Sequence, residues 1–357
     1  MTNRLSEPRL RLRAPVDVLA AVPYLIGYQP TDSVVVLAMR GRRLFFTVRD
    51  DLPPPDAPPD DVAAAVGEVL GMVVRQRVSG VLLVAYGPDG RARPVLFGLR
   101  DAFDAAGLAV LEMLRAADGR YWSYLCDNPH CCPPGGARYD VHTSPVPAEA
   151  TVAGCVALPD RDAYESLVRP EGGPSVVSVG QATVRAGDRL LALVSSGGQP
   201  AVLAAGRAAI DEAVGRQLGG GRLDDDDLGW LTVLLTSIPV RDIGLSRITG
   251  PPRVVEAHRT LWMDVFRRAA PDFVAAPGSL FAFAAWRCGE ATLARLALDR
   301  VLEAKPDYDL ARLMHRIVVA GLPPSVLDEF GLEQVRRRYG RRRRRRSSSR
   351  RAGNRRV

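Results

Sequence analysis

Residues 33–48 read Ser33-Val-Val-Val-Leu-Ala-Met-Arg-Gly-Arg-Arg-Leu-Phe-Phe-Thr-Val48. Two runs rich in β-branched and aromatic side chains, Val34–Met39 and Leu44–Val48, stand on either side of the polar residues 40–43, which include a glycine. Two short apolar runs joined by such a turn are typical of a β-hairpin. This stretch therefore predicts two paired strands, and it sets the structural class of the first half of the chain.

The sequence around this hairpin alternates between strand and helix patterns. Val81–Ala85 is a continuous apolar run that ends at Gly87-Pro88, as a buried strand does. Further strands are predicted at Leu108–Leu114 and Tyr121–Leu125, and helices at Pro15–Ile26, from a cap at Asp60 or Asp61 to about Val78, and at Pro94–Ala106. Together these elements predict an α/β or α+β domain with a mixed sheet.

The second half of the chain has a helical period. Before it, the β-branched stretch Val176–Val184 favours a strand. Helices are predicted at Leu190–Ser195, Pro200–Leu218, Leu228–Ile238, Val254–Ala269, Gly278–Arg287, Ala291–Ala304 and Leu310–Ala320. The prediction is an α/β mixed-sheet domain over residues 1–150, an irregular connector over 151–189, an all-α domain over 190–333 and a disordered Arg-rich tail over 334–357.

The charge of the chain is divided unevenly. Its formal net charge is +8, yet residues 336–357 hold 13 Arg and no Asp or Glu, so the remainder carries 8 − 13 = −5. Because like charges at this density repel each other, we expect this segment to be disordered and to bind polyanions. Nucleic acid, bound without sequence preference, an anionic lipid surface, and no dedicated partner are the alternatives. The residues expected to bind a polyanion are Arg341, Arg342, Arg343, Arg344, Arg345, Arg346, Arg350 and Arg351.

The sequence contains almost no lysine, which limits the enzyme classes it can belong to. Of the 48 basic residues only Lys305 is a lysine, and it directly precedes Pro306. A phosphate-binding P-loop needs a Gly-Lys pair, and a Schiff base or a kinase ion pair would have to use Lys305 at a predicted helix end. The chain also contains no Gly-x-Ser-x-Gly elbow and no His pair with zinc-protease spacing. The sequence thus argues against all of these enzyme classes.

The apolar segments predict no membrane span. Val16–Ile26 is short and is interrupted by Asp17 and Pro23, and Phe273–Trp286 contains a Pro-Gly pair and predicts a buried helix. We therefore expect a soluble cytoplasmic protein whose five cysteines are reduced thiols.

Residues 126–142 contain more than half of the cysteines and histidines of the chain, the residue types that bind zinc. They include three of the five Cys and two of the four His, and they predict a possible zinc site whose ligands would come from Cys126, His130, Cys131, Cys132 and His142. The separation of the cysteines, four residues and then none, departs from the usual pairs of zinc signatures. Two alternatives stay open: a buried corner in which small thiols pack under a tight turn, and a reactive thiol with a histidine base.

Other polar groups have simpler interpretations. Asp224–Asp227 precedes a helix and favours N-terminal capping over metal binding. Asp32-Ser33 and Arg49–Asp51 lie at strand ends, where either functional groups or turns and ion pairs are expected. Leu293–Val319 resembles one helix–turn–helix unit of the tetratricopeptide type, which predicts core packing or a protein partner on the helical half.

Several motifs together resemble one known family. They are Leu19-Ala-Ala-Val-Pro-Tyr-Leu-Ile-Gly27 with Pro30, Asp32 and Ser33-Val-Val-Val-Leu37; Arg49 with Asp51-Leu-Pro53; Trp122-Ser-Tyr-Leu-Cys126 with Cys131-Cys132-Pro133; and Ala275-Ala-Pro277, Trp286, Gly289, Ala294, Leu298 and Pro306-Asp-Tyr308. Over residues 9–325 the chain resembles the actinobacterial domain of unknown function 4192 family. The resemblance implies a continuous fold and a bacterial cytosolic setting, but no reaction. His130 and the Arg-rich tail lie outside the family pattern.

Two functional hypotheses follow from the sequence. The first is a binding or scaffolding protein with a polyanion-binding tail. The alternative is a metal- or thiol-dependent enzyme of the hydrolase class, which would use the Cys126–His142 segment together with Asp32 and Asp51.

Overall fold

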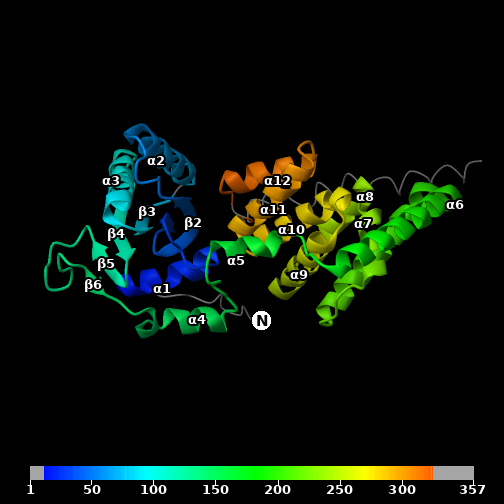
Figure 1. Cartoon of the computed structure of the whole chain (residues 1–357), viewed down its shortest axis with the longest axis horizontal. Helices are drawn as coiled ribbons and strands as arrows, with labels where there is room; N and C mark the ends of the chain where they lie inside the picture. Colours follow the sequence, from blue (N-terminus) through cyan, green and yellow to red (C-terminus); the bar gives the residue numbers. More distant parts are fainter. Residues whose placement is uncertain (1–11, 77, 323, 325–357) are drawn as a thin grey trace, which may run out of the picture. The chain divides into compact units, whose positions relative to one another are not determined.

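In the computed structural model, which describes residues 12–76, 78–322 and 324, the predicted hairpin is present (Figure 1). β1 (Ser33–Arg40) pairs antiparallel with β2 (Arg43–Asp51). Gly41 lies in the turn between them with a φ of 60°, a left-handed conformation that glycine adopts without steric cost. The two β-branched runs therefore pair through the short polar turn that separates them.

The hairpin forms one side of a mixed sheet. In the described part of the chain this sheet has six strands in the order β2-β1-β3-β4-β5-β6. The additional strands are β3 (Gly80–Tyr86), β4 (Ala109–Ala117), β5 (Arg120–Ser123) and β6 (Ala137–Arg138). β3 and β4 are parallel and are connected by α3 (Asp89–Ala105), whereas all other neighbours are antiparallel. The predicted mixed-sheet α/β class is confirmed.

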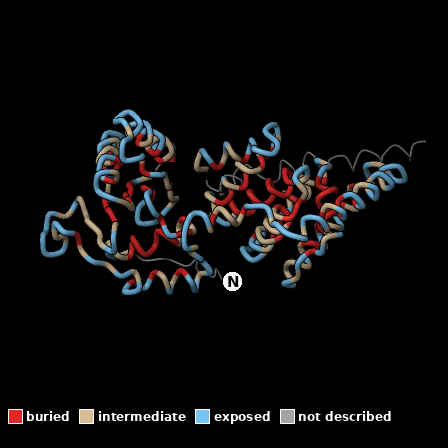
Figure 2. The backbone as a smooth tube through the Cα atoms, viewed as in Figure 1, coloured by how far each residue is buried: buried red, intermediate tan, exposed pale blue. Residues whose placement is uncertain are grey.

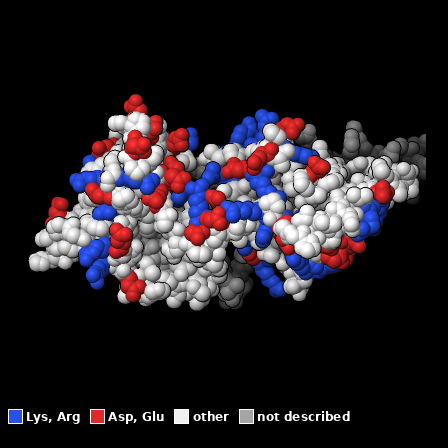
Figure 3. Space-filling model, in the orientation of Figure 1, with Lys and Arg blue, Asp and Glu red and all other residues white. Residues whose placement is uncertain are grey.

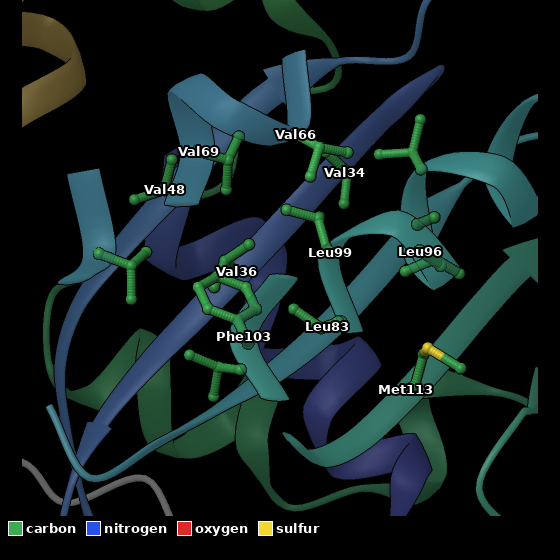
Figure 4. Packing of buried hydrophobic residues seen from close by; sticks show 14 of the residues in the cluster. Val34, Val36, Val48, Val66, Val69, Leu83, Leu96, Leu99, Phe103 and Met113 are labelled. Atoms are coloured by element: carbon green, nitrogen blue, oxygen red, sulfur yellow. The ribbon is translucent and has the colours of Figure 1, made fainter. Parts of the chain in front are cut away.

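Helices cover both faces of the central strand. Val34 and Val36 of β1 point toward α2 (Pro59–Val74) and α3, where they pack with Phe103 and Leu99 (Figure 4). Side chains alternate along a strand, so Val35 points to the opposite face, and it is fully buried too. α1 (Pro15–Ile26), which has the predicted bounds, lies on that second side (Figure 1). Burial on both faces explains why β1 is apolar throughout.

Short elements complete the first half of the chain. They are η1 (Val141–Thr143), α4 (Val146–Val152), α5 (Arg161–Glu165) and η2 (Ser166–Val168).

The chain divides into two compact units, of which the first contains the residues up to Pro170 together with Glu290–Arg300 and His315–Gly321. The second contains Glu171–Gly289 and Val301–Met314. The domain boundaries expected from the sequence stay predictions.

The remaining elements are helical. They are α6 (Pro174–Leu218), α7 (Asp225–Leu234), α8 (Ile238–Arg247), α9 (Pro252–Arg268), η3 (Pro271–Phe273), α10 (Ala275–Arg287), α11 (Ala291–Ala304) and α12 (Asp309–Val319). The predicted helical half is confirmed. α10 is buried along nearly its whole length, as its apolar sequence predicts. The tail predicted over residues 334–357 lies outside the described residues.

The predicted strand at Val176–Val184 is wrong, because these residues form part of α6. The stretch is rich in valine, but Val179, Thr183 and Ala186 are buried on one side at helical spacing. This helical face overrides the local β propensity. The two helices predicted further along α6 are separated by Gly198, whose φ of 59° and ψ of −160° interrupt the helix before Pro200.

Several helix boundaries also differ from the prediction. The N-cap of α2 is Pro58 rather than Asp60 or Asp61, since the chain enters the helix directly after the proline-rich loop. α3 begins at Asp89, so Pro94 lies inside the helix rather than at its start. The helix predicted over Leu228–Ile238 is α7, which ends at Leu234, and Ile238 begins α8 after a bend of 111°.

Among the residues that the structure describes, we find no single helix both long and apolar enough to cross a membrane. α7 and α8 together have the length and apolar composition of a membrane span, but they are bent by 111° at the break between them. The apolar side chains of α7, from Leu228 to Leu234, are buried within the helical unit.

α7 approaches the backbone of α6 closely at Gly229. A Cβ at this position would lie 2.8 Å from the carbonyl carbon of Ala182 and 2.9 Å from the amide nitrogen of Thr183, both in the backbone of α6. Backbone atoms of a packed helix cannot move aside as a side chain can. Gly187, on α6 itself, is different, because a Cβ there would meet no atom within 4 Å.

These two glycines predict opposite effects of the same substitution. Gly229→Ala should destabilise the protein by about 1–3 kcal/mol, because it forces α7 away from α6. Gly187→Ala should stabilise it by about 0.4–1 kcal/mol, because alanine is the better helix former and has room. Urea unfolding of both variants measures the two changes. Equal effects in the two variants would show that α6 and α7 do not pack as described.

His258 of α9 is a neutral core residue. Its side chain is only 1% exposed, and its Nδ1 accepts a hydrogen bond from Trp262 Nε1 at 3.2 Å. Burial lowers the pKa of His258 to about 4, although a hydrogen bond with the backbone of Arg247 opposes the shift. The histidine therefore stays unprotonated in the folded protein at pH values where it is charged in the unfolded chain.

The low pKa of His258 predicts a loss of stability in acid. Because the unfolded chain binds the proton first, the contribution is complete above about pH 6.5 and is lost as the pH falls toward 4, by about 3 kcal/mol in total. His258→Gln removes this titration, so its free energy of unfolding should fall less than that of the wild type over the same range. Urea unfolding followed by tryptophan fluorescence tests this, and parallel pH profiles for the two proteins would contradict it.

Candidate metal centre

The cysteine-rich segment is a loop that connects two paired strands, β5 and β6. The chain leaves β5 after Ser123 and returns as β6, which pairs antiparallel with β5. Tyr121 is opposite Ala137 and Arg120 is opposite Arg138 in this register. The intervening residues have no regular secondary structure, and the loop is largely solvent-exposed (Figure 2). Its two ends are nevertheless fixed by the sheet.

Trp122 supports the returning part of this loop. Its indole Nε1 donates a hydrogen bond to the carbonyl oxygen of Pro134 at 3.1 Å, and the guanidinium of Arg115 lies 3.6 Å from the centre of its ring. Gly136 has a φ of 78°, and a Cβ there would lie 2.5 Å from the Trp122 ring. Only glycine fits at position 136, which explains the second residue of the Gly-Gly pair. Arg120 Nη1 adds a hydrogen bond to the carbonyl oxygen of Gly136 at 2.8 Å.

Within the loop, Asn128 brings the thiols together. Its side-chain oxygen accepts a hydrogen bond from the amide of His130 at 3.0 Å, and its carbonyl oxygen accepts one from the amide of Cys132 at 2.9 Å. The resulting turn folds Cys131 and Cys132 back toward Cys126. The Sγ atoms of all three cysteines lie within 4.8 Å of one another, and those of Cys126 and Cys131 are 3.2 Å apart.

These separations fit a single thiophilic cation. Zinc binds cysteine sulfur at about 2.3 Å, so tetrahedral geometry places two sulfur ligands about 3.8 Å apart. The Sγ atoms of Cys126 and Cys131 are 3.2 Å apart and all three lie within 4.8 Å of one another, so only small side-chain shifts separate them from that arrangement. The adjacent Cys131 and Cys132, whose spacing counts against a zinc site in the sequence, therefore both reach the cluster. The three thiols are not in the core, since Cys131 is exposed and the other two are half-buried.

The two predicted histidine ligands are placed differently. Among the described residues, the group of ligand atoms within 4.8 Å contains neither His130 nor His142. His142 lies on η1, beyond β6, where its amide donates to Asp140 Oδ1 at 2.9 Å. The structure thus brings together three of the five residues suggested by the sequence, and the role of the histidines as ligands stays a prediction.

The thiols are electrostatically unequal. A hydrogen bond with Cys131, with further bonds from the Asn128 backbone and Cys132, lowers the pKa of Cys126. Burial, together with hydrogen bonds to the other two thiols, raises the pKa of Cys132 to about 12. The first thiolate of the cluster is thus expected at Cys126, and the neighbouring thiols stabilise it by donating hydrogen bonds.

The carboxylates at the strand ends are in ion pairs. Asp32 Oδ1 lies 2.5 Å from Arg91 Nη1. Asp51 contacts Arg49 at 2.7 Å and Arg161 of α5 at 2.9 Å. Although burial opposes it, these arginines hold the pKa of Asp51 below its ordinary value. The ion-pair interpretation of these residues therefore accounts for their positions.

Asp224–Asp227 acts as the predicted helix cap. Asp224 is the N-cap of α7, and its Oδ1 accepts a hydrogen bond from the amide of Asp227 at 2.8 Å. Asp225 is paired with Arg268 and Asp227 with Arg216. Asp224 and Asp227 share Arg216, and Asp226 pairs with Arg185, so capping and pairing explain the acidic run.

One polar network is not predicted by any pattern in the sequence. Tyr124 donates a hydrogen bond to Asp89 Oδ1 at 2.5 Å and accepts one from Arg115 Nε at 3.1 Å. Burial and the bond to Asp89 raise the pKa of Tyr124 to about 12. The network lies at the carboxyl ends of the parallel strands β3 and β4. Asp89 begins α3, Arg115 lies on β4 and Tyr124 follows β5, and only the general preference for functional groups at this edge could have indicated the network.

Comparison with known proteins gives one result. Residues 15–325 match the family described as Domain of unknown function (DUF4192). No curated protein and no solved structure matches the chain. The match covers β1 to β6, the thiol loop and all the helices from α1 to α12, and it ends before the Arg-rich segment 336–357. The predicted resemblance is confirmed, and the chain belongs to the DUF4192 family.

Proposed function

We propose that this protein binds a thiophilic metal ion, with Zn²⁺ as the first choice, through Cys126, Cys131 and Cys132. The observation that carries the proposal is the convergence of their three Sγ atoms within 4.8 Å. Thiolates are soft ligands that select zinc and other soft cations over magnesium or calcium. Three sulfur ligands leave one coordination position, which solvent or a further side chain can fill.

The loop is suited to hold an ion because its backbone is already organised. β5 and β6 fix its ends, and the bond from the Cys132 amide to Asn128 sets the turn between the ligands. Little chain entropy remains to be lost when the ligands bind, and this favours affinity. The partial exposure of the sulfur atoms gives the ion a direct path from solvent.

Binding has more support than catalysis. A hydrolase at this loop would need a base or a carboxylate beside the metal, and the carboxylates suggested for that role, Asp32 and Asp51, are paired with arginines. The two carboxylates named in the competing hypothesis of a metal- or thiol-dependent hydrolase are thus already held in ion pairs. A site of three thiolates also carries negative charge, which weakens the metal as a Lewis acid.

Metal titration of the full-length reduced protein tests the proposal. We expect one equivalent of Zn²⁺ to bind in competition with a chromogenic chelator, and Co²⁺ to give a thiolate charge-transfer band. Cys126→Ser should weaken binding by at least about 100-fold, more than changes outside the ligand shell do. Cys155→Ser is the matched control, since Cys155 is an exposed cysteine outside the cluster.

Two results would remove the metal site: no stoichiometric binding by the reduced protein, or equal affinities in the Cys126→Ser and Cys155→Ser variants. His130→Ala and His142→Ala extend the test to the fourth ligand. A loss as large as that of Cys126→Ser in one of them would identify that histidine as the ligand.

A second activity is proposed for the Arg-rich segment 336–357, which lies outside the described residues. Its 13 arginines contrast with the net charge of −5 on the rest of the chain. On the face drawn in Figure 3, acidic and basic side chains of the described residues are interspersed rather than gathered by sign. We infer that nucleic-acid phosphates are bound through the tail, without sequence preference. A protein partner on the helical half stays a prediction.

Deletion of residues 336–357 should abolish retention of DNA at low salt and leave the melting temperature unchanged, because the arginines supply the phosphate contacts. Electrophoretic mobility shifts and thermal unfolding of both proteins provide the measurement. Vesicles that contain an anionic lipid serve as the comparison, and tighter binding to them than to DNA would reverse the assignment. A truncated protein that binds DNA as tightly as the full chain would place the interface on the folded part instead.

A further inference from the structure

Two of the three clustered sulfur atoms are in direct contact. The Sγ atoms of Cys126 and Cys131 are 3.2 Å apart, whereas a disulfide bond is about 2.05 Å long. Closing this distance requires the two sulfurs to approach each other by about 1.2 Å. Apart from Cys126, the Cys131 sulfur contacts the carbonyl oxygen of Asn128 at 3.5 Å, which is a weak restraint on such a movement.

The chain around these sulfurs can accommodate the movement. Both cysteines belong to the irregular part of the loop, and Cys131 is exposed, so an oxidant can reach it from solvent. The fixed parts, β5, β6 and the Trp122 contact with Pro134, lie outside the five-residue step from Cys126 to Cys131. A bond between the two would thus close a small loop without disturbing the sheet.

Cys132 is the less suitable partner. Cα atoms of neighbouring residues are about 3.8 Å apart, below the range of about 4.4–6.8 Å that disulfides usually span, so a bond between Cys131 and Cys132 would be strained. The amide of Cys132 is also held by the carbonyl oxygen of Asn128 at 2.9 Å. The geometry therefore selects Cys126 and Cys131 from the three possible pairs.

We propose that Cys126 and Cys131 form a reversible disulfide, a modification that withdraws two of the three metal ligands and so couples metal binding to redox state. The second part of this statement rests on the proposed metal site, and the first does not. The oxidant is a hydroperoxide, with hydrogen peroxide as the simplest member of the class. Cys132 stays a thiol in both states.

The reaction balances with hydrogen peroxide alone. One thiol attacks a peroxide oxygen, the O–O bond breaks, and a sulfenic acid and one water form. The second thiol then attacks the sulfenic sulfur, and the S–S bond forms as a second water leaves. In total two thiols and one peroxide give one disulfide and two waters, so the sulfurs lose two electrons and the peroxide gains them. A dithiol reductant reverses the step by thiol–disulfide exchange.

The test uses the full-length protein, reduced and free of metal. After treatment with an equimolar amount of hydrogen peroxide, the remaining thiols are alkylated and the peptides are identified by mass spectrometry. We expect a disulfide between Cys126 and Cys131, with Cys132 alkylated. Cys131→Ser should abolish this species, and Cys155→Ser should leave its yield unchanged. The oxidised protein should bind Zn²⁺ at least about 100-fold more weakly until dithiothreitol restores it.

The outcomes separate this inference from the proposed function. Stoichiometric zinc binding together with oxidation only to sulfinic acid, or to a bond that involves Cys132 or Cys155, overturns the disulfide and keeps the metal site. A disulfide between Cys126 and Cys131 in a chain that never binds zinc supports the dithiol pair and overturns the proposed function. A correct disulfide that leaves zinc affinity unchanged overturns the redox coupling.

Discussion

β1 lies between β2 and β3, and the side chains on both of its faces are buried. A strand with no solvent-exposed face requires a layer of helices on each side, which α2 and α3 provide on one side and α1 on the other. The burial decreases toward the far edge of the sheet. There β5 and β6 are short, and the loop between them is left open to solvent. The clustered thiols therefore lie at the edge of the hydrophobic core, where the sheet still fixes both ends of their loop.

The elements that could be predicted from the sequence are those whose pattern is local. The hairpin at β1 and β2, and the helices α1 and α11, follow from runs of apolar residues bounded by proline or glycine. The sequence predicts a strand at Val176–Val184 because valine favours strands. Only the packing of these residues against α7 shows that they form one face of a helix. The break between α7 and α8 does have a local signal. Pro239 lies in the first turn of α8, a position that proline favours.

The candidate site was only partly predictable, for a geometric reason. The number of residues between two ligands indicates their distance in space only when the chain between them is extended or helical. Asn128 makes a turn instead, so the neighbours Cys131 and Cys132 both face Cys126. Among the described residues, the two histidines lie outside the group of three sulfur atoms. His142 is close in sequence, but β6 intervenes and carries the chain away before η1.

The proposed metal site and the proposed disulfide have one structural cause. A loop fixed at both ends holds three sulfur atoms nearly in contact, and sulfur in this arrangement has two favourable outcomes: sharing a soft cation, or forming a bond between two of its members. The two outcomes compete for Cys126 and Cys131, because a sulfur in a disulfide has no thiolate to offer a metal. A bound cation must in turn protect both thiols from oxidation. Occupancy and redox state are therefore linked in both directions, as thermodynamic linkage requires of two events at one site.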